Sequence, residues 1–417
     1  MRIFKRVGRA ALVCAAMGCL LGGVASAADT VKIGVIEPMS GNAASVGASA
    51  KAGIEVAMDI INNAHSDLGD ILLAKDAGLK NLGGAKVQVV FADNQGSPSA
   101  GQNQALRLIT QEHVTALVGA YQSGITLTAS AVAERYGVPF VNGASVASNL
   151  TERGYKWFFR TTPIATDIAN VYMSFLKDMK SRGKKVDNLA IVYENTDYGT
   201  SISNVLSAAA KRDGFNVISN LAYSANTSDV SSTVLQLKNV KPDAVIFVSY
   251  TSDAILYAKT MKSLDYKPPI LIGDDSGFSD PTFIKTVGAD VQGVLNRSVW
   301  STGKPGSATY LINEMYKKKT GAELDTSTAR IMQAFFVLAD AINRAGSTDP
   351  AKIQAALKAT DIKPPQLIVG FKGVKFNDQG QNVLASAVMI QLHGDRYVEV
   401  WPKEKATAEL QLPYKGW

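Results

Sequence analysis

Strand-like and helix-like segments alternate along this chain, and the strand-like segments are apolar on both faces. The segment Ala244–Val248 reads Ala-Val-Ile-Phe-Val and offers no polar residue to turn toward water. A helix-like segment, Ala254–Leu264, separates it from the next strand-like segment, Ile270–Gly273. Strands buried on both sides are typical of a parallel sheet, because each crossover places a helix on a sheet face. The pattern therefore predicts an α/β protein.

The same reading extends over most of the chain. It indicates further strands at residues 31–36, 87–91, 116–118, 138–141, 158–160, 189–193, 216–221, 373–376, 385–391 and 397–401. It indicates helices at residues 47–63, 100–111, 167–180, 199–212, 230–237, 307–320, 326–345 and 350–359, with another ending at residue 136. Residues 64–84 form an insertion that reads either as a surface loop or as a short helix.

One opening pattern occurs twice. Val31–Ile36 leads through a polar loop to Gly47 and an Ala-rich helix, and Leu189–Tyr193 leads in the same way to Gly199. We therefore expect two structurally similar lobes, each a mostly parallel sheet flanked by helices. A single sheet for the whole chain is the less favoured alternative, because chains of this length tend to divide into domains.

The first residues have the pattern of a secretory signal peptide. Basic residues precede an apolar run, Ala10–Val24, and Ala25-Ser26-Ala27 supplies a cleavage site. The run is shorter than a membrane-spanning helix usually requires, and no later uninterrupted apolar run matches its length. We expect cleavage after Ala27 and a soluble mature protein in the periplasm. Cys19 lies in a weak match to a lipoprotein box, so lipidation there is an alternative.

Cleavage would also remove most of the excess positive charge. Four of the 43 basic residues and none of the 36 acidic ones precede residue 28, so the formal net charge falls from +7 to +3. So small a charge gives no case for nucleic-acid binding. Both cysteines, Cys14 and Cys19, lie in the signal segment. The mature chain therefore has no thiol for a disulfide, a metal site or a nucleophile.

Residues suited to catalysis are sparse. The three histidines, His65, His113 and His393, lack metal-ligand spacing, and neither a G-x-S-x-G elbow nor a dinucleotide fingerprint follows the predicted strands. Asp274-Asp275 is weak evidence for a metal site, because no further oxygen ligands lie nearby in the sequence. We predict no metal, no cofactor and no enzymatic activity. A secreted enzyme of the same architecture is the alternative.

Two strand-to-helix junctions lie within the segment Ala116–Leu150. Ser123 follows the first strand and Ser145 follows the second. Small ligands bind at the carboxyl ends of strands in α/β sheets, and a helix start offers free N–H groups to an anion. The pair of serines therefore suggests a site for a small carboxylate. The alternative is that both serines only cap helices.

The order of motifs resembles the leucine/isoleucine/valine-binding proteins of bacterial ABC importers. The resemblance covers nearly the whole mature chain, and the insertion at residues 64–84 departs from it. It rests on Val31-Lys32-Ile33-Gly34-Val35-Ile36-Glu37-Pro38-Met39-Ser40-Gly41, Gly47, Gly53, Val118-Gly119, Ser123, Gly137-Val138-Pro139, Asn149–Tyr155, Phe159-Arg160-Thr161, Asp197-Tyr198-Gly199, Asp243–Val248 and Gly273.

The resemblance implies a type I periplasmic binding fold, in which two lobes joined by three crossovers close on a ligand. We place the crossovers near Thr162, Val299 and Leu384. Lobe 1 would then hold residues 28–162 and 299–384, and lobe 2 would hold residues 163–298 and 385–417.

The resemblance also assigns ligand contacts in lobe 1. The carboxylate of the ligand would lie on Ser123, and the Ala144-Ser145 pair would share it through backbone groups and a hydroxyl. Val46 takes the position that covers the ligand. The branched-chain prototypes carry an aromatic residue at this position, from which Val46 departs.

Lobe 2 would supply the aromatic and acidic contacts. Tyr198 and Tyr250 match positions that close over the ligand, and Tyr121 of lobe 1 would complete an apolar wall with a polar rim. Asp275 falls at the acidic position that pairs with the ammonium of the ligand, with Asp274 as the neighbouring alternative. Each tyrosine is otherwise an ordinary boundary aromatic, and Asp275 is otherwise a turn or cap residue.

These assignments predict a periplasmic binding protein that captures a neutral or branched-chain-type amino acid for the membrane permease of an ABC importer. We expect it to act as a monomer. An aromatic carboxylate or a short amide without an ammonium group is the alternative ligand. Delivery to a receptor instead of a permease is a further possibility that the sequence leaves open.

Overall fold

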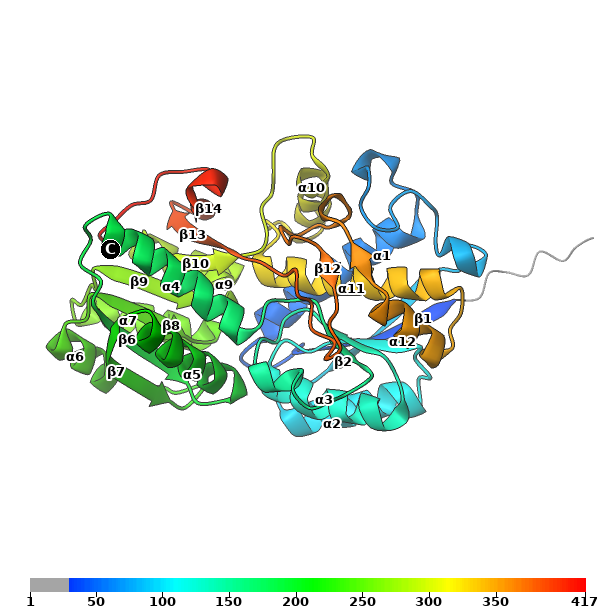
Figure 1. Cartoon of the computed structure of the whole chain (residues 1–417), viewed down its shortest axis with the longest axis horizontal. Coiled ribbons are helices and arrows are strands. Elements are labelled where there is room, and N and C mark those ends of the chain that lie inside the picture. Colours follow the sequence, from blue (N-terminus) through cyan, green and yellow to red (C-terminus); the bar gives the residue numbers. More distant parts are fainter. Residues whose placement is uncertain (1–29) are drawn as a thin grey trace, which may run out of the picture.

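The computed structural model describes residues 30–417. The predicted signal peptide, its cleavage site after Ala27 and the candidate lipidation site Cys19 lie outside the described residues. The strands form two large sheets with helices on both faces, and the two sheets belong to two lobes set side by side (Figure 1). The predicted α/β class and the two-lobed arrangement are confirmed.

Lobe 1 is built on a sheet of five strands that are all parallel. Their order is β2-β1-β3-β4-β5. The strands are β1 (Val31–Glu37), β2 (Val87–Asp93), β3 (Ala116–Gly119), β4 (Phe140–Asn142) and β5 (Phe158–Arg160).

Lobe 2 is built on a sheet of seven strands in the order β14-β13-β10-β9-β8-β6-β7. The strands from β10 to β7 run parallel, whereas β13 and β14 pair antiparallel at one edge. The strands are β6 (Asn188–Glu194), β7 (Asn216–Tyr223), β8 (Ala244–Val248), β9 (Ile270–Asp274), β10 (Leu295–Ser298), β13 (Val388–His393) and β14 (Arg396–Trp401).

Separate apolar clusters fill the space between helices and sheet on the two faces of each lobe. In lobe 1, one face carries α1 (Ala44–Asn62), α10 (Ala308–Thr320), α11 (Thr326–Ala345) and α12 (Pro350–Lys358), and the other carries α2 (Pro98–Thr110) and α3 (Ser123–Tyr136). In lobe 2, one face carries α4 (Ala165–Ser181) and α5 (Asp197–Arg212), and the other carries α6 (Ser231–Val240), α7 (Thr251–Ser263), α8 (Ser276–Ser279) and α9 (Pro281–Val287).

The insertion at residues 64–84 forms two single turns of 3-10 helix, Ser66–Leu68 and Lys80–Leu82. Leu68 is fully buried against the core of lobe 1, so the insertion is anchored to that core. A small antiparallel pair, β11 (Asp361–Ile362) and β12 (Val374–Lys375), precedes the return of the chain to lobe 2.

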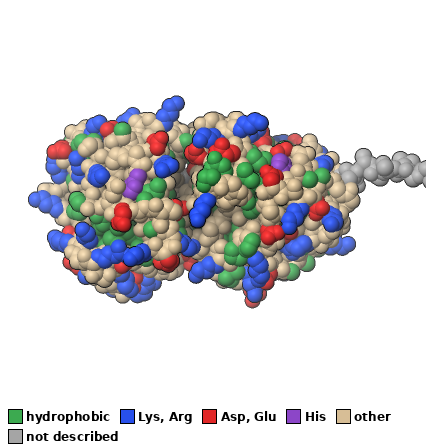
Figure 2. Space-filling view, turned by 90° about the horizontal axis from the view of Figure 1, so that it is seen from above, with side chains coloured by type: hydrophobic (Ala, Val, Ile, Leu, Met, Phe, Trp, Pro, Cys, Tyr) green, Lys and Arg blue, Asp and Glu red, His purple; other side chains and the backbone are tan. Residues whose placement is uncertain are grey.

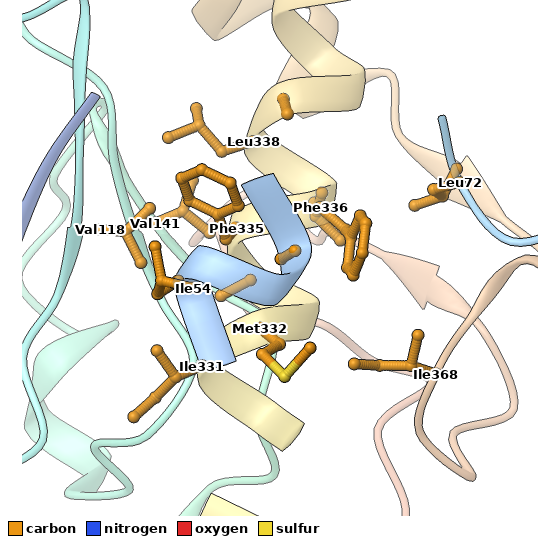
Figure 3. Packing of buried hydrophobic residues seen from close by; sticks show 14 of the residues in the cluster. Ile54, Leu72, Val118, Val141, Ile331, Met332, Phe335, Phe336, Leu338 and Ile368 are labelled. Atoms are coloured by element: carbon orange, nitrogen blue, oxygen red, sulfur yellow. The ribbon is translucent and has the colours of Figure 1, made fainter. Parts of the chain in front are cut away.

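Helix α11 is the centre of lobe 1. Asp325 caps its start by accepting hydrogen bonds from the N–H groups of Ser327 and Thr328, and Gly346 ends it in the left-handed conformation. Nearly every position of α11 is buried, because α1 covers one side and the sheet covers the other (Figure 3). The packing makes α11 a rigid support for the side chains at its first turns.

Among the described residues, none of the helices combines the length and the hydrophobicity that a membrane span requires.

The chain passes between the two lobes three times: after β5, after β10 and before β13. Buried amides tie the first and third passages together. The side-chain amide of Gln381 donates to the carbonyl of Thr162 at 2.9 Å, and that of Asn382 donates to the carbonyl of Thr161 at 3.0 Å. The segments that link the lobes are therefore cross-braced.

Candidate functional site

The lobes meet near the carboxyl ends of their central strands. In lobe 1, β1 lies between β2 and β3, and in lobe 2, β6 lies between β7 and β8. Where the strand order reverses in this way, the loops diverge and leave a crevice in which ligands bind. Tyr121 follows β3 and Tyr250 follows β8, so each lobe contributes a predicted aromatic residue from its own reversal point.

The three predicted tyrosines come together across the boundary between the lobes. The ring centroid of Tyr250 lies 5.7 Å from that of Tyr121 and 5.4 Å from that of Tyr198. These separations are favourable for aromatic pairs. Tyr250 also packs against the apolar cores of both lobes. Burial raises the pKa values of Tyr198 and Tyr250 well above the usual range, so both phenols stay neutral at physiological pH.

Other contacts show that the lobes are closed against each other. The hydroxyl of Ser45, in the first turn of α1, donates to the carboxylate of Asp280 in lobe 2 at 3.1 Å. The N–H of Ser148 in lobe 1 donates to the hydroxyl of Ser201 on α5 at 3.0 Å. These contacts join elements that are far apart in the sequence.

The two predicted serines are buried, and neither is a helix cap. Ser123 is the first residue of α3 and accepts a hydrogen bond from the N–H of Ala147 at 3.3 Å. The hydroxyl of Ser145 lies 2.7 Å from that of Thr126 and within hydrogen-bond distance of the carbonyls of Ala120 and Tyr121. The Ser145 hydroxyl therefore braces the turn after β3, which leaves backbone groups as the means by which this segment would contact a ligand.

Val46 and Ala144 lie on the lobe 1 side of the boundary. Both are buried, and both belong to the same apolar cluster as Tyr121. Val46 sits in the first turn of α1, and Ala144 follows β4. The residues predicted for the apolar side of the site in lobe 1 are thus in one cluster.

Asp275 is paired with two arginines. Its carboxylate lies 2.6 Å from the guanidinium of Arg330 on α11 and 3.1 Å from that of Arg297 on β10. The backbone of Asp275 adopts a φ of +63°, a costly conformation for a residue with a side chain, and the side-chain amide of Asn296 bonds both its N–H and its carbonyl. This conformation directs Asp275 across the boundary, to an arginine of the other lobe.

Asp274 serves the interior of lobe 2. Its carboxylate accepts hydrogen bonds from the hydroxyls of Tyr172 and Tyr198 and lies 2.9 Å from Nε of Arg297. Burial alone would lower the pKa of Arg297, but the two adjacent aspartates hold it well above its usual range. Of the two neighbouring carboxylates, Asp275 is therefore the one that reaches lobe 1.

The arginines change the expected chemistry of the site. Arg297 and Arg330 carry two positive charges that offset the charges of Asp274 and Asp275, and both arginines are almost fully buried. An ammonium group at Asp275 would compete with two guanidinium groups already in place. Neither arginine was predicted from the sequence. The signal for Arg330 is a basic residue in a helix that is otherwise mostly apolar.

Glu37 is a third buried charged residue that the sequence did not indicate as part of the site. It ends β1, is fully buried, and neither of its carboxylate oxygens makes a hydrogen bond. Burial raises its pKa to about 8, and the nearby N–H of Tyr121 lowers it only in part. This carboxyl group is therefore mostly protonated at neutral pH.

A cavity of about 290 Å³ opens at the boundary beside Tyr250. A Cβ at Gly124 on its wall would lie 2.9 Å from the carboxylate of Asp197 in the other lobe, so the two lobes approach closely at this point. Polar groups of both lobes line it, among them Asn42, Gln95, Gln122, Thr196, Asp197 and Asn226. The described residues contain no group of three or more His, Cys, Asp or Glu side chains placed to hold a metal ion.

The two α/β lobes close over buried aromatic and charged groups, and the chain passes between them three times. These features define a two-lobed solute-binding protein of the type I periplasmic class. Residues 30–391 match the family described as periplasmic binding protein. The chain belongs to this family.

Curated relatives match nearly the whole chain. This chain is 32% identical over 422 residues to the Leu/Ile/Val-binding protein homolog 7 of Brucella suis, with 96% of this chain and 99% of the relative covered. It is 31% identical over 416 residues to homolog 8 of the same organism, with 96% and 98% covered.

Solved structures share the fold. A leucine-binding protein from Thermotoga maritima superposes with a TM-score of 0.75 at 24% identity, covering 89% of this chain and 98% of that one. A solute-binding protein from Rhodopseudomonas palustris in complex with 3,4-dihydroxybenzoic acid gives a TM-score of 0.72 at 18% identity, covering 93% and 99%. The fold is thus shared by proteins with different ligands.

Proposed function

We propose that this chain captures a small neutral amino acid of the branched-chain type in the periplasm and delivers it to the permease of an ABC importer. The observation that carries the proposal is the closed boundary between the lobes, where Tyr121, Tyr198 and Tyr250 meet beside buried polar groups. The names of the curated relatives, Leu/Ile/Val-binding protein homologs, support the ligand class.

The proposed mechanism is closure around the solute. Residues 28–162 with 299–384 would move against residues 163–298 with 385–417 about the three linking segments. Ser123 and the backbone of Ala144-Ser145 would hold the carboxylate, with the start of α3 favouring its negative charge. Val46 and the tyrosines would contact the side chain of the solute. Closure would bury the ligand and strengthen these contacts by excluding water.

In this proposal the protein binds without chemical turnover. It needs no cofactor, works as a monomer and presents the closed form to a membrane permease. The charge distribution gives no reason to invoke a nucleic acid, since basic side chains lie scattered among acidic ones on the face shown in Figure 2.

A small carboxylate without an ammonium group is the second candidate ligand. The pairing of Asp275 with Arg297 and Arg330 favours it, because the acid expected to receive an ammonium is already neutralised. Arg330 also keeps an Nε–H with no hydrogen-bond partner. The Rhodopseudomonas palustris relative in complex with 3,4-dihydroxybenzoic acid shows that this fold can hold such a compound.

Two measurements test the proposal. Mass spectrometry of small molecules released by denaturing the purified protein would identify a retained ligand. Isothermal titration calorimetry with leucine, isoleucine, valine, phenylalanine, 4-methylpentanoate and 3,4-dihydroxybenzoate would rank the classes. Binding of amino acids supports the first candidate, and binding of the two simple carboxylates alone supports the second. Conversion of any bound compound to a product would contradict both.

A further inference from the structure

Glu37 lies where the central strand of lobe 1 reaches the boundary between the lobes. Side chains alternate along β1: Ile33 and Val35 face the cluster that contains α1 and α11, whereas Ile36 faces the opposite cluster. The alternation places Glu37 on the α1 and α11 face, at the end of the strand. Its carboxyl group lies close enough to the N–H of Tyr121 to be affected by it. Tyr121 is the residue whose ring meets Tyr250 of lobe 2.

The carboxyl group of Glu37 differs from the other buried carboxyl groups near the boundary. Glu194 accepts hydrogen bonds from Thr196 and Gly199, and Asp253 accepts them from the N–H of Asn226. Asp274, at the end of β9, is held by Arg297 and two tyrosines, and Asp275 is held by Arg297 and Arg330. Among the described residues, Glu37 is the buried acidic residue with neither carboxylate oxygen in a hydrogen bond. Burial without compensation is costly and calls for an explanation.

The surroundings of Glu37 hold no cation of their own to pair with it. Asp93 lies opposite it on β2, and that carboxylate is occupied by Ser40 and by the N–H groups of Met39 and Gln95. Arg330 of α11 is directed to Asp275, and no charged group is among the causes of the raised pKa of Glu37. No ion pair involves Glu37 among the described residues. A cation that pairs with it would have to arrive from outside the chain.

We propose that Glu37 binds the ammonium group of the ligand and takes the role that the resemblance gave to Asp275. This inference rests on the proposed function, because it supposes a ligand bound between the lobes near Tyr121. The geometry then explains three features together: a buried acid with no charged partner and only the nearby N–H of Tyr121, an expected acid already neutralised by two arginines, and an aromatic boundary beside both. Glu37 becomes a specificity-determining residue for zwitterions.

Binding would move one proton. In the ligand-free protein the carboxyl group of Glu37 is protonated below about pH 8, because its burial disfavours the charged form. An arriving ammonium group keeps its own protons and favours the carboxylate, so Glu37 gives its proton to solvent. We expect wild-type protein to release close to one proton per leucine bound near pH 6.5. Its affinity for leucine would rise as the pH approaches 8.

The test compares leucine with 4-methylpentanoate, which has the same carbon skeleton without the ammonium. Calorimetry on Glu37→Gln should show leucine binding weakened about 30-fold or more, because a buried charge would lose its partner. Binding of 4-methylpentanoate should change less than about 3-fold. Glu152→Gln, at an exposed position, is the matched control and should leave both affinities unchanged. Asp275→Asn should weaken both ligands alike, because it loosens closure rather than removing the ammonium partner.

Two further readouts separate the possible failures. Calorimetry in buffers of different ionisation enthalpy should detect proton release with wild type and none with Glu37→Gln. If wild type binds leucine and Glu37→Gln binds it equally well, the inference is overturned while the proposed function stands. If wild type binds 4-methylpentanoate and no amino acid, both the amino-acid proposal and this inference are overturned. A ligand-free Glu37→Gln protein whose thermal stability follows pH as wild type does would show that Glu37 has a partner, and would also overturn the inference.

Discussion

Strands β1 and β6 end in the same residue type, but the two terminal residues have different surroundings. Each strand lies at the centre of its sheet and ends in a buried glutamate, Glu37 in lobe 1 and Glu194 in lobe 2. Each is followed by a helix whose early glycine packs against the strand end. A Cβ on Gly47 would lie 2.0 Å from the carbonyl of Pro38, and one on Gly199 would lie 2.0 Å from the carbonyl of Glu194.

The two glutamates nevertheless have different partners. Glu194 accepts hydrogen bonds at 2.7–2.8 Å from the N–H and hydroxyl of Thr196 and from the N–H of Gly199. It therefore acts as a cap for α5. Glu37 makes no such bond. Matching strand ends thus hold one carboxylate that caps a helix and one buried carboxyl group without such bonds. Four predictions follow from this difference and from the contacts between the lobes.

The largest expected effect is on the pH dependence of stability. The pKa of Glu37 is raised from 4.5 to about 8 in the folded state, so the folded protein holds this proton more tightly than the unfolded chain. Its contribution to the free energy of unfolding should fall as the pH rises from about 4.5 to about 8, by at most about 5 kcal/mol. Glu37→Gln should remove this fall. Chemical denaturation across that pH range would measure it, with Glu152→Gln as the control.

Removal of the ion pair between the lobes should have the next largest effect. Arg330→Met leaves Asp275 with Arg297 alone, and we expect it to lower the free energy of unfolding by about 2–3 kcal/mol. Arg182→Met, which breaks an exposed pair with Asp178, is the control and should cost less than about 1 kcal/mol. Urea denaturation would compare the two. Equal losses would show that the buried pair does not stabilise the closed lobes.

At neutral pH the two glutamates should respond in opposite directions to the same substitution. Glu194→Gln replaces one acceptor oxygen by an N–H₂ group that faces backbone donors, and should cost about 1–2 kcal/mol at pH 7. Glu37→Gln should instead raise the free energy of unfolding at that pH by up to about 3 kcal/mol, because it removes a group that ionises in the unfolded chain but stays mostly protonated in the folded protein. Thermal unfolding of the pair would measure the difference. A loss of the same size in both variants would remove the distinction between them.

The smallest effect on stability should come from Ser123. Ser123→Ala removes one long hydrogen bond to Ala147 and should cost about 0.5–1 kcal/mol. Ser130→Ala, another buried serine of α3, should cost a similar amount. The two variants should differ in binding, because only Ser123 is proposed to hold the carboxylate of the ligand. We expect about 5–20-fold weaker leucine binding for Ser123→Ala alone, measured by calorimetry.

Local patterns in the sequence predicted most of the secondary structure. The strand at Ala244–Val248 and the helix at Thr326–Ala345 have the predicted bounds, because long apolar segments with clear periodicity are the most readable ones. The short strand Leu295–Ser298 and the helix Pro281–Val287 were missed. Leu295–Ser298 carries an asparagine, an arginine and a serine, so its pattern does not resemble that of a buried strand.

The candidate site was predictable in part. The tyrosines and Ser123 were selected from junctions and from the resemblance, and the structure places the tyrosines together. The partners of Asp275 could not be read from the chain, because Arg330 lies 55 residues away and on the other lobe. In the sequence, Glu37 was only one residue of the motif that carries the resemblance, and no role was assigned to it. Its lack of hydrogen-bond partners depends on the loops and helices that surround it.

The sequence by itself determined the class of fold, because apolar periodicity dictates which segments bury which faces. It also determined the family, through an ordered series of motifs. Only the tertiary structure decided which charges neutralise one another. Ion pairs and hydrogen bonds form between groups a few ångströms apart, and that distance is set by how two lobes close, not by spacing along the chain. The pairing of Asp275 and the isolation of Glu37 both follow from that closure.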